Sequence, residues 1–364
     1  MLALGDDSGR VMMVDEATGE VKWAVQAHAD IGDIATRVAM SPNGRFVASV
    51  ATGSVNWKLW QAASGAEWMA GVRHDGTGTC TCQVDDIGRR VLQAGCPVVA
   101  HTTGLGAVVF SPCGKRFATG GYKGAVILWD PQTGEAVQRM EAGSGFVRCL
   151  SFTADGARLA SGGFNISQAA SICVWDTTTG ALLHTIRCPD TTPLRASSVQ
   201  FSPTNPLTLA SANLRISLWD VTSGEMIRTV PGFGCVHFSP DGRTFATTEF
   251  PGEVALMDFQ SGERRLTLVG HHGKVEGACW SEDGSKLATV SFDGTCMVWD
   301  SSTGALLRTI QMATPIKTVS WGRDWVRDTQ RGVAFAMGYH PRLGADSRVL
   351  ALDTGVVRMI LDRV

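Results

Sequence analysis

Several residues with metal-binding side chains lie close together in the first third of the chain: His74, Cys80, Cys82, Cys96 and His101. Thiolate and imidazole groups are the ligands that structural zinc prefers. The spacing is poor, because the single C-x-C pair has no second C-x-C or H-x₃-H arm to complete a tetrahedral site. We interpret these residues as ordinary side chains of a loop, and we predict no metal and no other cofactor.

Sequence signatures of catalysis are missing from the chain. It contains no G-x-S-x-G elbow, no H-E-x-x-H and no G-x-x-x-x-G-K-[ST] phosphate loop. Asp220, Asp258 and Asp300 recur at equivalent places, but a periodic carboxylate at a strand end is typical of a turn acceptor. We therefore predict that the protein is not an enzyme.

Short apolar runs divide the chain into eight copies of one unit. Each run ends in an aromatic or apolar residue, usually followed by Asp and then by a Thr-Gly or Ser-Gly turn. The terminal residues of the runs are Val14, Trp60, Trp129, Trp175, Trp219, Met257, Trp299 and Leu352. A strand-turn-strand unit that recurs about every forty residues is typical of a β-propeller. The sequence thus predicts an all-β fold of four-stranded antiparallel blades.

The copy at residues 270–310, GHHGKVEGACWSEDGSKLATVSFDGTCMVWDSSTGALLRTI, closely resembles the WD40 repeat. In that family a buried His, a Ser or Thr, an Asp and the Trp form a hydrogen-bonded chain. The resemblance assigns these roles to His271, Ser291, Asp293 and Trp299. A buried Asp must be paired and a buried Trp N–H needs an acceptor, which supports the assignment. Other copies match less fully, so the resemblance implies a WD40-type β-propeller.

We expect a single propeller domain over residues 1–364. The chain opens at Met1 inside a second-strand pattern, and the last copy, 316–361, has enough sequence for four strands. Either eight blades close with one strand missing, or seven close and the N-terminal fragment completes the seam; a truncated gene model is a third interpretation. We favour eight blades. Stretches near 73–97 and 322–345 exceed the repeat and are expected to be surface insertions.

An aromatic residue recurs in the turn between the second and third strands of several copies. Tyr122, Phe250 and Phe292 stand at this position, and Phe164 joins them if residues 165–169 lie in the same turn. In WD40 proteins this turn and the start of the inner strand line the top face, where partners dock. The resemblance adds the inner-strand residues Phe146, Arg148, Lys274, Glu276 and Lys317. Aromatic and Arg side chains are common interface anchors. The other interpretation is that the rings pack between blades.

Bulk charge gives no reason to expect nucleic acid or a membrane surface as a partner. Lys and Arg number 32 against 34 Asp and Glu, and neither sign forms a run. The 10 cysteines are dispersed, several inside strand-like runs, which suits reduced thiols. No secretory segment follows Met1, and no apolar stretch approaches the roughly twenty residues that a membrane span needs. We expect a cytoplasmic protein.

Together these features predict a scaffold or adaptor that binds other proteins or peptide segments on the top face of the propeller. One alternative is a structural subunit of a large ciliary or signalling assembly. Another follows from residues 8–23, SGRVMMVDEATGEVKW, which look like the Trp-bearing repeat of quinoprotein dehydrogenases. That oxidoreductase interpretation is weaker, because the distal Trp does not recur and no carboxylate cluster for calcium is evident.

Overall fold

The computed structural model describes most of the first 322 residues of the chain. The described residues are 1–28, 36–52, 54–71, 101, 104–141, 143, 145–164, 171–187, 197–213, 215–249 and 252–322, with only the backbone at 83–84, 90–91, 164 and 171. Two compact units are distinguished, Met1–Gly322 and Arg323–Val364. The second unit, with the predicted insertion near 322–345, lies outside the described residues. The expectation of one domain over 1–364 therefore stays a prediction.

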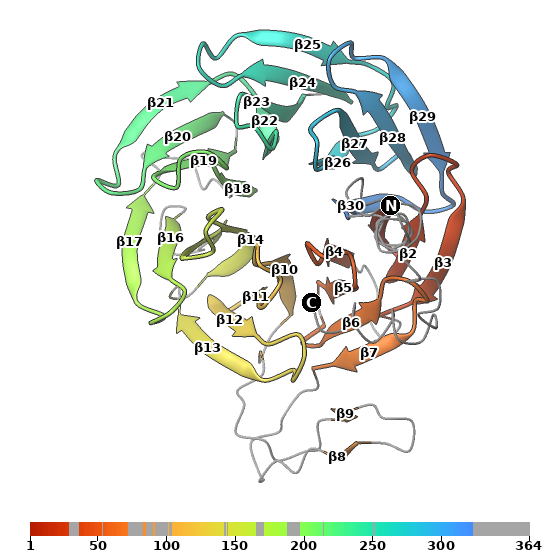
Figure 1. The fold of residues 1–364 in the computed structure, drawn as a ribbon. Helices are drawn as coiled ribbons and strands as arrows, with labels where there is room; N and C mark the ends of the chain where they lie inside the picture. The colour runs from red at the N-terminus through yellow and green to blue at the C-terminus, as the bar shows by residue number, and fades with distance from the viewer. Residues whose placement is uncertain are drawn as a thin grey trace, which may run out of the picture. The chain divides into compact units, whose positions relative to one another are not determined.

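Seven four-stranded antiparallel sheets are formed by the described residues, and they are arranged as blades around a ring (Figure 1). In six blades the strands follow one another in the chain from the innermost to the outermost. These are β4 (Thr36–Met40), β5 (Phe46–Ala51), β6 (Trp57–Gln61), β7 (Glu67–Ala70); β10 (Leu105–Phe110), β11 (Phe117–Gly121), β12 (Ala125–Trp129), β13 (Ala136–Glu141); and β14 (Phe146–Phe152), β15 (Arg158–Phe164), β16 (Ser171–Asp176), β17 (Leu182–Arg187). They continue with β18 (Ser198–Phe201), β19 (Thr208–Ala212), β20 (Ile216–Asp220), β21 (Met226–Val230); β22 (Phe233–Phe238), β23 (Thr244–Glu249), β24 (Glu253–Asp258), β25 (Arg264–Leu268); and β26 (Val275–Trp280), β27 (Lys286–Ser291), β28 (Thr295–Asp300), β29 (Leu306–Gln311).

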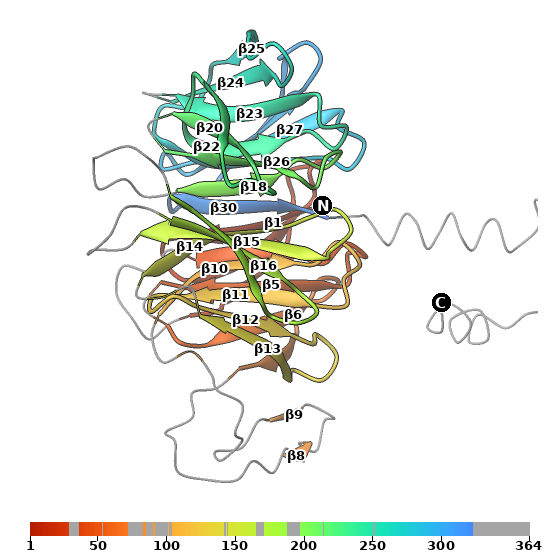
Figure 2. The same ribbon diagram turned by 90° about the vertical axis from the view of Figure 1, so that its left-hand side faces the viewer.

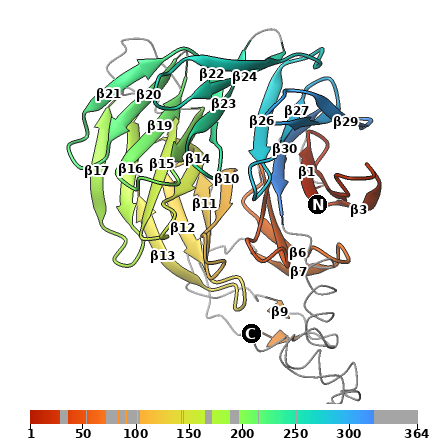
Figure 3. The same ribbon diagram turned by 45° about the horizontal axis from the view of Figure 1, so that its top comes forward.

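The seventh blade joins the two ends of this unit. Its innermost strand is β30 (Ile316–Trp321), followed by β1 (Leu2–Asp6), β2 (Arg10–Val14) and β3 (Val21–Gln26). Strands β30 and β1 are antiparallel, with Leu4 opposite Val319, and Figures 2 and 3 both show the two strands side by side. The Thr314 hydroxyl also donates to Asp6 Oδ2 at 2.7 Å. The ring is thus closed by a blade built from both ends of Met1–Gly322.

This closure corrects the predicted number of blades, which is seven rather than eight. The N-terminal strands do not form an incomplete extra blade, because β30 supplies their missing inner strand. Seven clusters of buried apolar residues lie in the described ring, and each draws on two neighbouring blades. Seven interfaces between seven blades leave no open end of the ring, which is how a propeller protects its sheet edges.

The second and third strands of a blade are largely buried because neighbouring blades cover both faces. Strands β5 and β12, for example, are buried at every residue, whereas outermost strands such as β17 and β29 alternate exposed and covered residues. A strand covered on both faces is expected to be continuously apolar. Among the described residues there is no helix of the length and hydropathy that a membrane span requires.

The recurring carboxylates are turn acceptors, as predicted. Asp300 Oδ1 accepts the backbone N–H groups of Ser302 at 3.0 Å and Thr303 at 2.8 Å, and Gly304 follows with φ of +74°. The hydroxyl and backbone donors of this turn, led by the Ser302 hydroxyl, lower the pKa of Asp300 to about 2. Asp220 and Asp258 form the same turn in their own blades. These carboxylates therefore fix the link between the third and fourth strands.

The two short strands β8 (Gln83–Val84) and β9 (Arg90–Val91) pair with each other in a separate sheet. They fall within the stretch near 73–97 that the sequence marks as an insertion, and the rest of that stretch lies outside the described residues. Neither strand is part of a blade.

Because β30 closes the ring, a chain ending at Gly322 is expected to fold and one ending at Pro315 to be strongly destabilised. The shorter chain loses the buried side chains of Ile316 and Val319, each about 1.5–3 kcal/mol, and leaves the edge of β1 unpaired. Urea unfolding followed by tryptophan fluorescence compares the two chains. Equal unfolding midpoints would contradict the seven-bladed closure.

Candidate functional site

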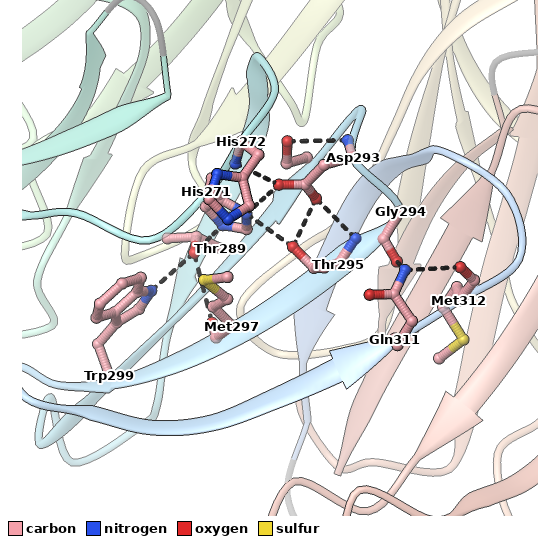
Figure 4. Close-up of polar contacts among 11 residues, drawn as sticks. His271, His272, Thr289, Asp293, Gly294, Thr295, Met297, Trp299, Gln311 and Met312 are labelled. Carbon is pink, nitrogen blue, oxygen red and sulfur yellow. Dashed lines mark hydrogen bonds and ion pairs between the residues drawn. The ribbon is translucent and has the colours of Figure 1, made fainter.

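A chain of hydrogen bonds crosses blade β26–β29 and ends at the turn between β27 and β28 (Figure 4). Trp299 Nε1 donates to Thr289 Oγ1 at 2.8 Å, and the same oxygen lies 2.8 Å from His271 Nε2. His271 Nδ1 lies 3.3 Å from Asp293 Oδ2. Since the carboxylate can only accept, these contacts assign the imidazole proton to Nδ1, and Nε2 accepts from the Thr289 hydroxyl.

Ser291 does not have the role that the sequence assigned to it, because Thr289 is the residue that joins His271 to Trp299. The Ser291 hydroxyl instead accepts the backbone N–H of Asp293 at 3.2 Å. Ser291 is the last residue of β27, beside the turn. Thr289 faces the same side two residues earlier, where both rings are within reach. The register of the strand, rather than the residue type, decides between the two hydroxyls.

Shorter versions of this chain occur in four other blades. The hydroxyl that accepts the Trp N–H always lies two residues after the residue paired with that Trp on the neighbouring strand. The versions are His28–Ser49–Trp60, His101–Thr119–Trp129, Ser161–Trp175 and Ser211–Trp219. Sequence analysis missed His28, which follows Ala27 rather than the Gly of the family's Gly-His pair. This spacing from the Trp partner is the signal that would have found the hydroxyls.

The complete chain in blade β26–β29 holds the turn that carries Phe292. Asp293 Oδ1 accepts Thr295 N at 2.8 Å, and Asp293 Oδ2 accepts His272 N at 2.8 Å. The Phe292 N–H donates to Lys274 O at 3.0 Å. Burial lowers the pKa of His271, and the neighbouring Asp293 charge opposes this shift. The turn is therefore fixed at both ends by polar contacts.

Phe292 is exposed and is flanked by cationic side chains. Its side chain is 43% exposed, and Lys317 Nζ, from the inner strand of the next blade, lies 3.3 Å from the ring centroid. Lys274 Nζ lies 6.0 Å from the same centroid. An ammonium held over an aromatic face is attracted by the ring quadrupole. The contact orients Phe292 across a blade boundary while leaving part of the ring open to solvent.

A cavity of about 560 Å³ lies at the centre of the ring, and residues from all seven inner strands line it. The lining comes mainly from the first residues of these strands, so the cavity lies toward the face that carries the Phe292 turn, which we call the top face. One inner strand shifts its pairing register around Gly106, and three others shift around a single charged residue: Arg148, Glu276 and Lys317. A β-bulge re-aims the side chain of its extra residue. The bulges thus bring these three residues into the cavity lining.

Positive charge prevails in this cavity. Its described lining contains four cationic residues, Arg37, Arg148, Lys274 and Lys317. Glu276 is the one acidic residue of that described lining. Lys274 Nζ lies 2.7 Å from Glu276 Oε1, so that carboxylate is already paired. Arg37 donates to Lys317 O at 2.8 Å.

Burial lowers the pKa of both Arg37 and Lys317, while the Glu276 carboxylate opposes each shift. The Arg37 charge also lowers the pKa of Lys317, and the Arg148 charge lowers the pKa of Arg37. Crowded cations in a partly dry site are costly unless an anion is near.

The remaining predicted top-face residues divide into two groups. Tyr122 and Phe146 pack edge to face across a blade boundary, with ring centroids 5.0 Å apart, as the packing interpretation expects. The backbone of Phe164 pairs with that of Phe146, and its side chain is outside the described part. Phe250 also lies outside the described residues. Phe292 is thus the described ring of this set that remains exposed.

Arg37 was missed by sequence analysis. Counting back from the turn after the inner strand aligns Arg37 with Gly277, and aligns Thr36 with Glu276. Strand β4 pairs with β5 without the bulge found in β26, so its residues run one place out of step with those of β26. Only the pairing register therefore reveals that Arg37 faces the cavity.

The cavity offers no activated nucleophile or base among its described residues. Burial raises the pKa of Cys149 to about 12 and that of Cys235 to about 11, so both thiols are protonated at neutral pH. Burial lowers the pKa of His237 to about 4. His101, one of the metal-ligand candidates, belongs to a Trp129 hydrogen-bond chain, and His74, Cys80, Cys82 and Cys96 lie outside the described residues. The arrangement suits recognition of a charged group.

Comparisons with known proteins agree with the repeat architecture. The family model "WD domain, G-beta repeat" matches residues 95–130, 134–176 and 262–300. WD repeat-containing protein 1 of Gallus gallus is 27% identical over 238 residues, covering 60% of this chain and 37% of the relative. Autophagy-related protein 16 of Arabidopsis thaliana is 24% identical, covering 62% and 44%. Actin-interacting protein 1 of Drosophila melanogaster is 26% identical, covering 59% and 36%. The matches thus span less than half the length of these relatives.

Replacing Thr289 with Val is expected to lower the free energy of unfolding by about 2–4 kcal/mol, because it strands Trp299 Nε1 and His271 Nε2 in the core. Thr289→Ser keeps the hydroxyl and should retain most of the stability. Ser291→Ala is the matched control, with an expected loss below about 1 kcal/mol. Urea melts of the three variants decide, and a larger loss for Ser291→Ala than for Thr289→Val would overturn the assignment.

The buried imidazole of His101 should make folding stability fall in acid. Burial lowers its pKa to about 3, whereas an unfolded His titrates near 6.5, so between these values the unfolded chain binds the extra proton. Stability therefore decreases as the pH falls through this window, by up to about 1.4 kcal/mol per pH unit for this residue.

His101→Gln removes this titrating group. Between about pH 6 and 4.5, the unfolding free energy should then change less steeply with pH, by the contribution of about one proton. Urea melts at several pH values measure the slope. His272→Gln, at an exposed position, is the matched control. An unchanged slope in His101→Gln would contradict a neutral buried imidazole.

Proposed function

The chain is a WD40-repeat β-propeller, and from this premise we propose that it is a non-catalytic scaffold that binds protein segments on its top face. The observation that carries the proposal is Phe292, an exposed aromatic ring on a turn fixed by the Asp293 network and oriented by Lys317. It stands beside a central cavity with Arg148 in its lining. Aromatic and Arg side chains on a rigid surface are the usual anchors of protein interfaces.

Rigidity supports this role because a partner then loses less entropy on binding. The turn of Phe292 is tied to Lys274 by a backbone hydrogen bond and to His272 through Asp293. A preorganised surface spends little of its interaction energy on ordering its own side chains. The top face is therefore suited to hold a flexible segment of another protein.

The relatives favour interaction over catalysis. WD40 propellers are in general non-catalytic and bind other proteins, and the relatives that match this chain are WD repeat proteins. The name of the Drosophila relative describes that protein as actin-interacting. Each match covers only part of its relative, so we propose for this chain a partner-binding role and no particular partner.

Phe292→Ser is expected to weaken partner binding at least tenfold without unfolding the protein, because it removes an anchor worth about 2 kcal/mol or more. Leu307→Ser is the matched control, since Leu307 is similarly exposed, at 49%, on the outermost strand of the same blade. Affinity capture with quantitative mass spectrometry, alongside thermal melts, compares both variants with the wild type. If the folded Phe292→Ser variant retained every partner at wild-type levels, the top-face proposal would fail.

A further inference from the structure

We propose that the central cavity selects acidic peptide segments, with Arg37 and Arg148 binding the carboxylates; this rests on the proposed function and names the chemistry of its partner. Four cations and one carboxylate are found in the described lining. The sequence composition does not indicate this excess of positive charge, since the whole chain has a formal net charge of −2. The positive charge is thus a local property of the cavity.

Within the described part of the chain, nearby carboxylates compensate the positive charge of the cavity only in part. Glu276 pairs with Lys274, and neither Arg37, Arg148 nor Lys317 makes an ion pair with another described residue. Arg148 is exposed, while Arg37 is half-buried and uses one of its N–H groups to donate a hydrogen bond to the Lys317 carbonyl. A guanidinium group has five N–H donors in a planar fork that matches a carboxylate. Both arginines therefore keep donors for an incoming anion.

The cavity provides backbone contacts as well as charge. Each inner strand lies at the end of its sheet, so one of its edges faces the centre of the ring. Unpaired backbone donors and acceptors on a strand edge can bind an extended chain. Phe233 also lines the cavity and is 39% exposed, and Phe292 stands nearby. An extended peptide that combines carboxylates with apolar side chains would match all three features.

A nucleic acid fits these observations less well. Its binding depends on many phosphate contacts spread over a basic surface. Here the cations are gathered within a cavity of about 560 Å³, in a chain whose overall charge is slightly negative. A short acidic peptide can place its carboxylates beside the cations of the cavity. Unlike a nucleic acid, it does not bring a long polyanion close to the rest of the protein surface.

The test measures binding of a short fluorescein-labelled peptide of alternating Glu and Leu by fluorescence anisotropy. The same peptide with Gln in place of every Glu is the neutral probe. We expect the acidic peptide to bind at least tenfold more tightly at about 50 mM salt, with the difference shrinking as salt is added. Equal affinities for the two peptides would overturn the acidic selectivity while leaving a partner-binding top face intact.

Two variants change the cavity charge in opposite directions. Arg148→Gln should weaken binding of the acidic peptide about tenfold, and Glu276→Gln should strengthen it several-fold, with the neutral peptide unaffected by either. Arg139→Gln, on the outer strand β13, is the control and should behave as wild type. A purely structural effect would not move the affinity in both directions.

The proposal is overturned if neither peptide binds, or if both cavity variants bind the acidic peptide as the wild type does. Those outcomes are distinct from failure of the proposed function, which is judged by partner capture with Phe292→Ser. Loss of capture in that variant together with equal binding of the two peptides would keep the top-face site and reject its acidic specificity.

Discussion

Pairing of β30 with β1 is the interaction on which the rest of the propeller depends. A blade buries its middle strands only when another blade covers each of its faces, so an open arc of blades would leave two apolar faces in water. The closing blade meets both neighbours: Leu2 and Leu4 pack with residues of blade β26–β29, and Ala3 and Val11 pack with residues of blade β4–β7. Closure therefore turns separate sheets into one continuous core.

Within that ring, the hydrogen-bond chains link the core to the surface. A Trp on the third strand and a His near the inner strand reach the same hydroxyl in three blades, and blade β26–β29 extends the contact to Asp293. Because the imidazole and the carboxylate satisfy each other, the turn of Phe292 can stay close-packed beneath an exposed ring. Polar groups in the interior thus hold the turn that carries Phe292 on the top face.

The cavity charge arises from distant parts of the chain. Arg37, Arg148 and Lys317 belong to three different blades, and each is placed by the start of an inner strand. Bulges at Arg148 and Lys317 turn these side chains inward, whereas β4 brings Arg37 to the cavity through regular pairing. The positive charges of these side chains repel one another, and an anion bound between them would reduce that repulsion.

The sequence by itself determined the repeating unit. Apolar runs, the Asp-containing turns and the Trp at the end of the third strand are local features, and strand formation and turn geometry depend mainly on local residues. The resemblance to WD40 repeats also brought Phe292, Lys274, Glu276, Arg148 and Lys317 to attention. Tertiary structure alone decided the number of blades, since that depends on which distant strand pairs with β1. It likewise decided that Thr289 rather than Ser291 joins the buried rings, and that Arg37 faces the cavity. These outcomes depend on strand register and bulges, where a shift of one residue changes which side chains meet.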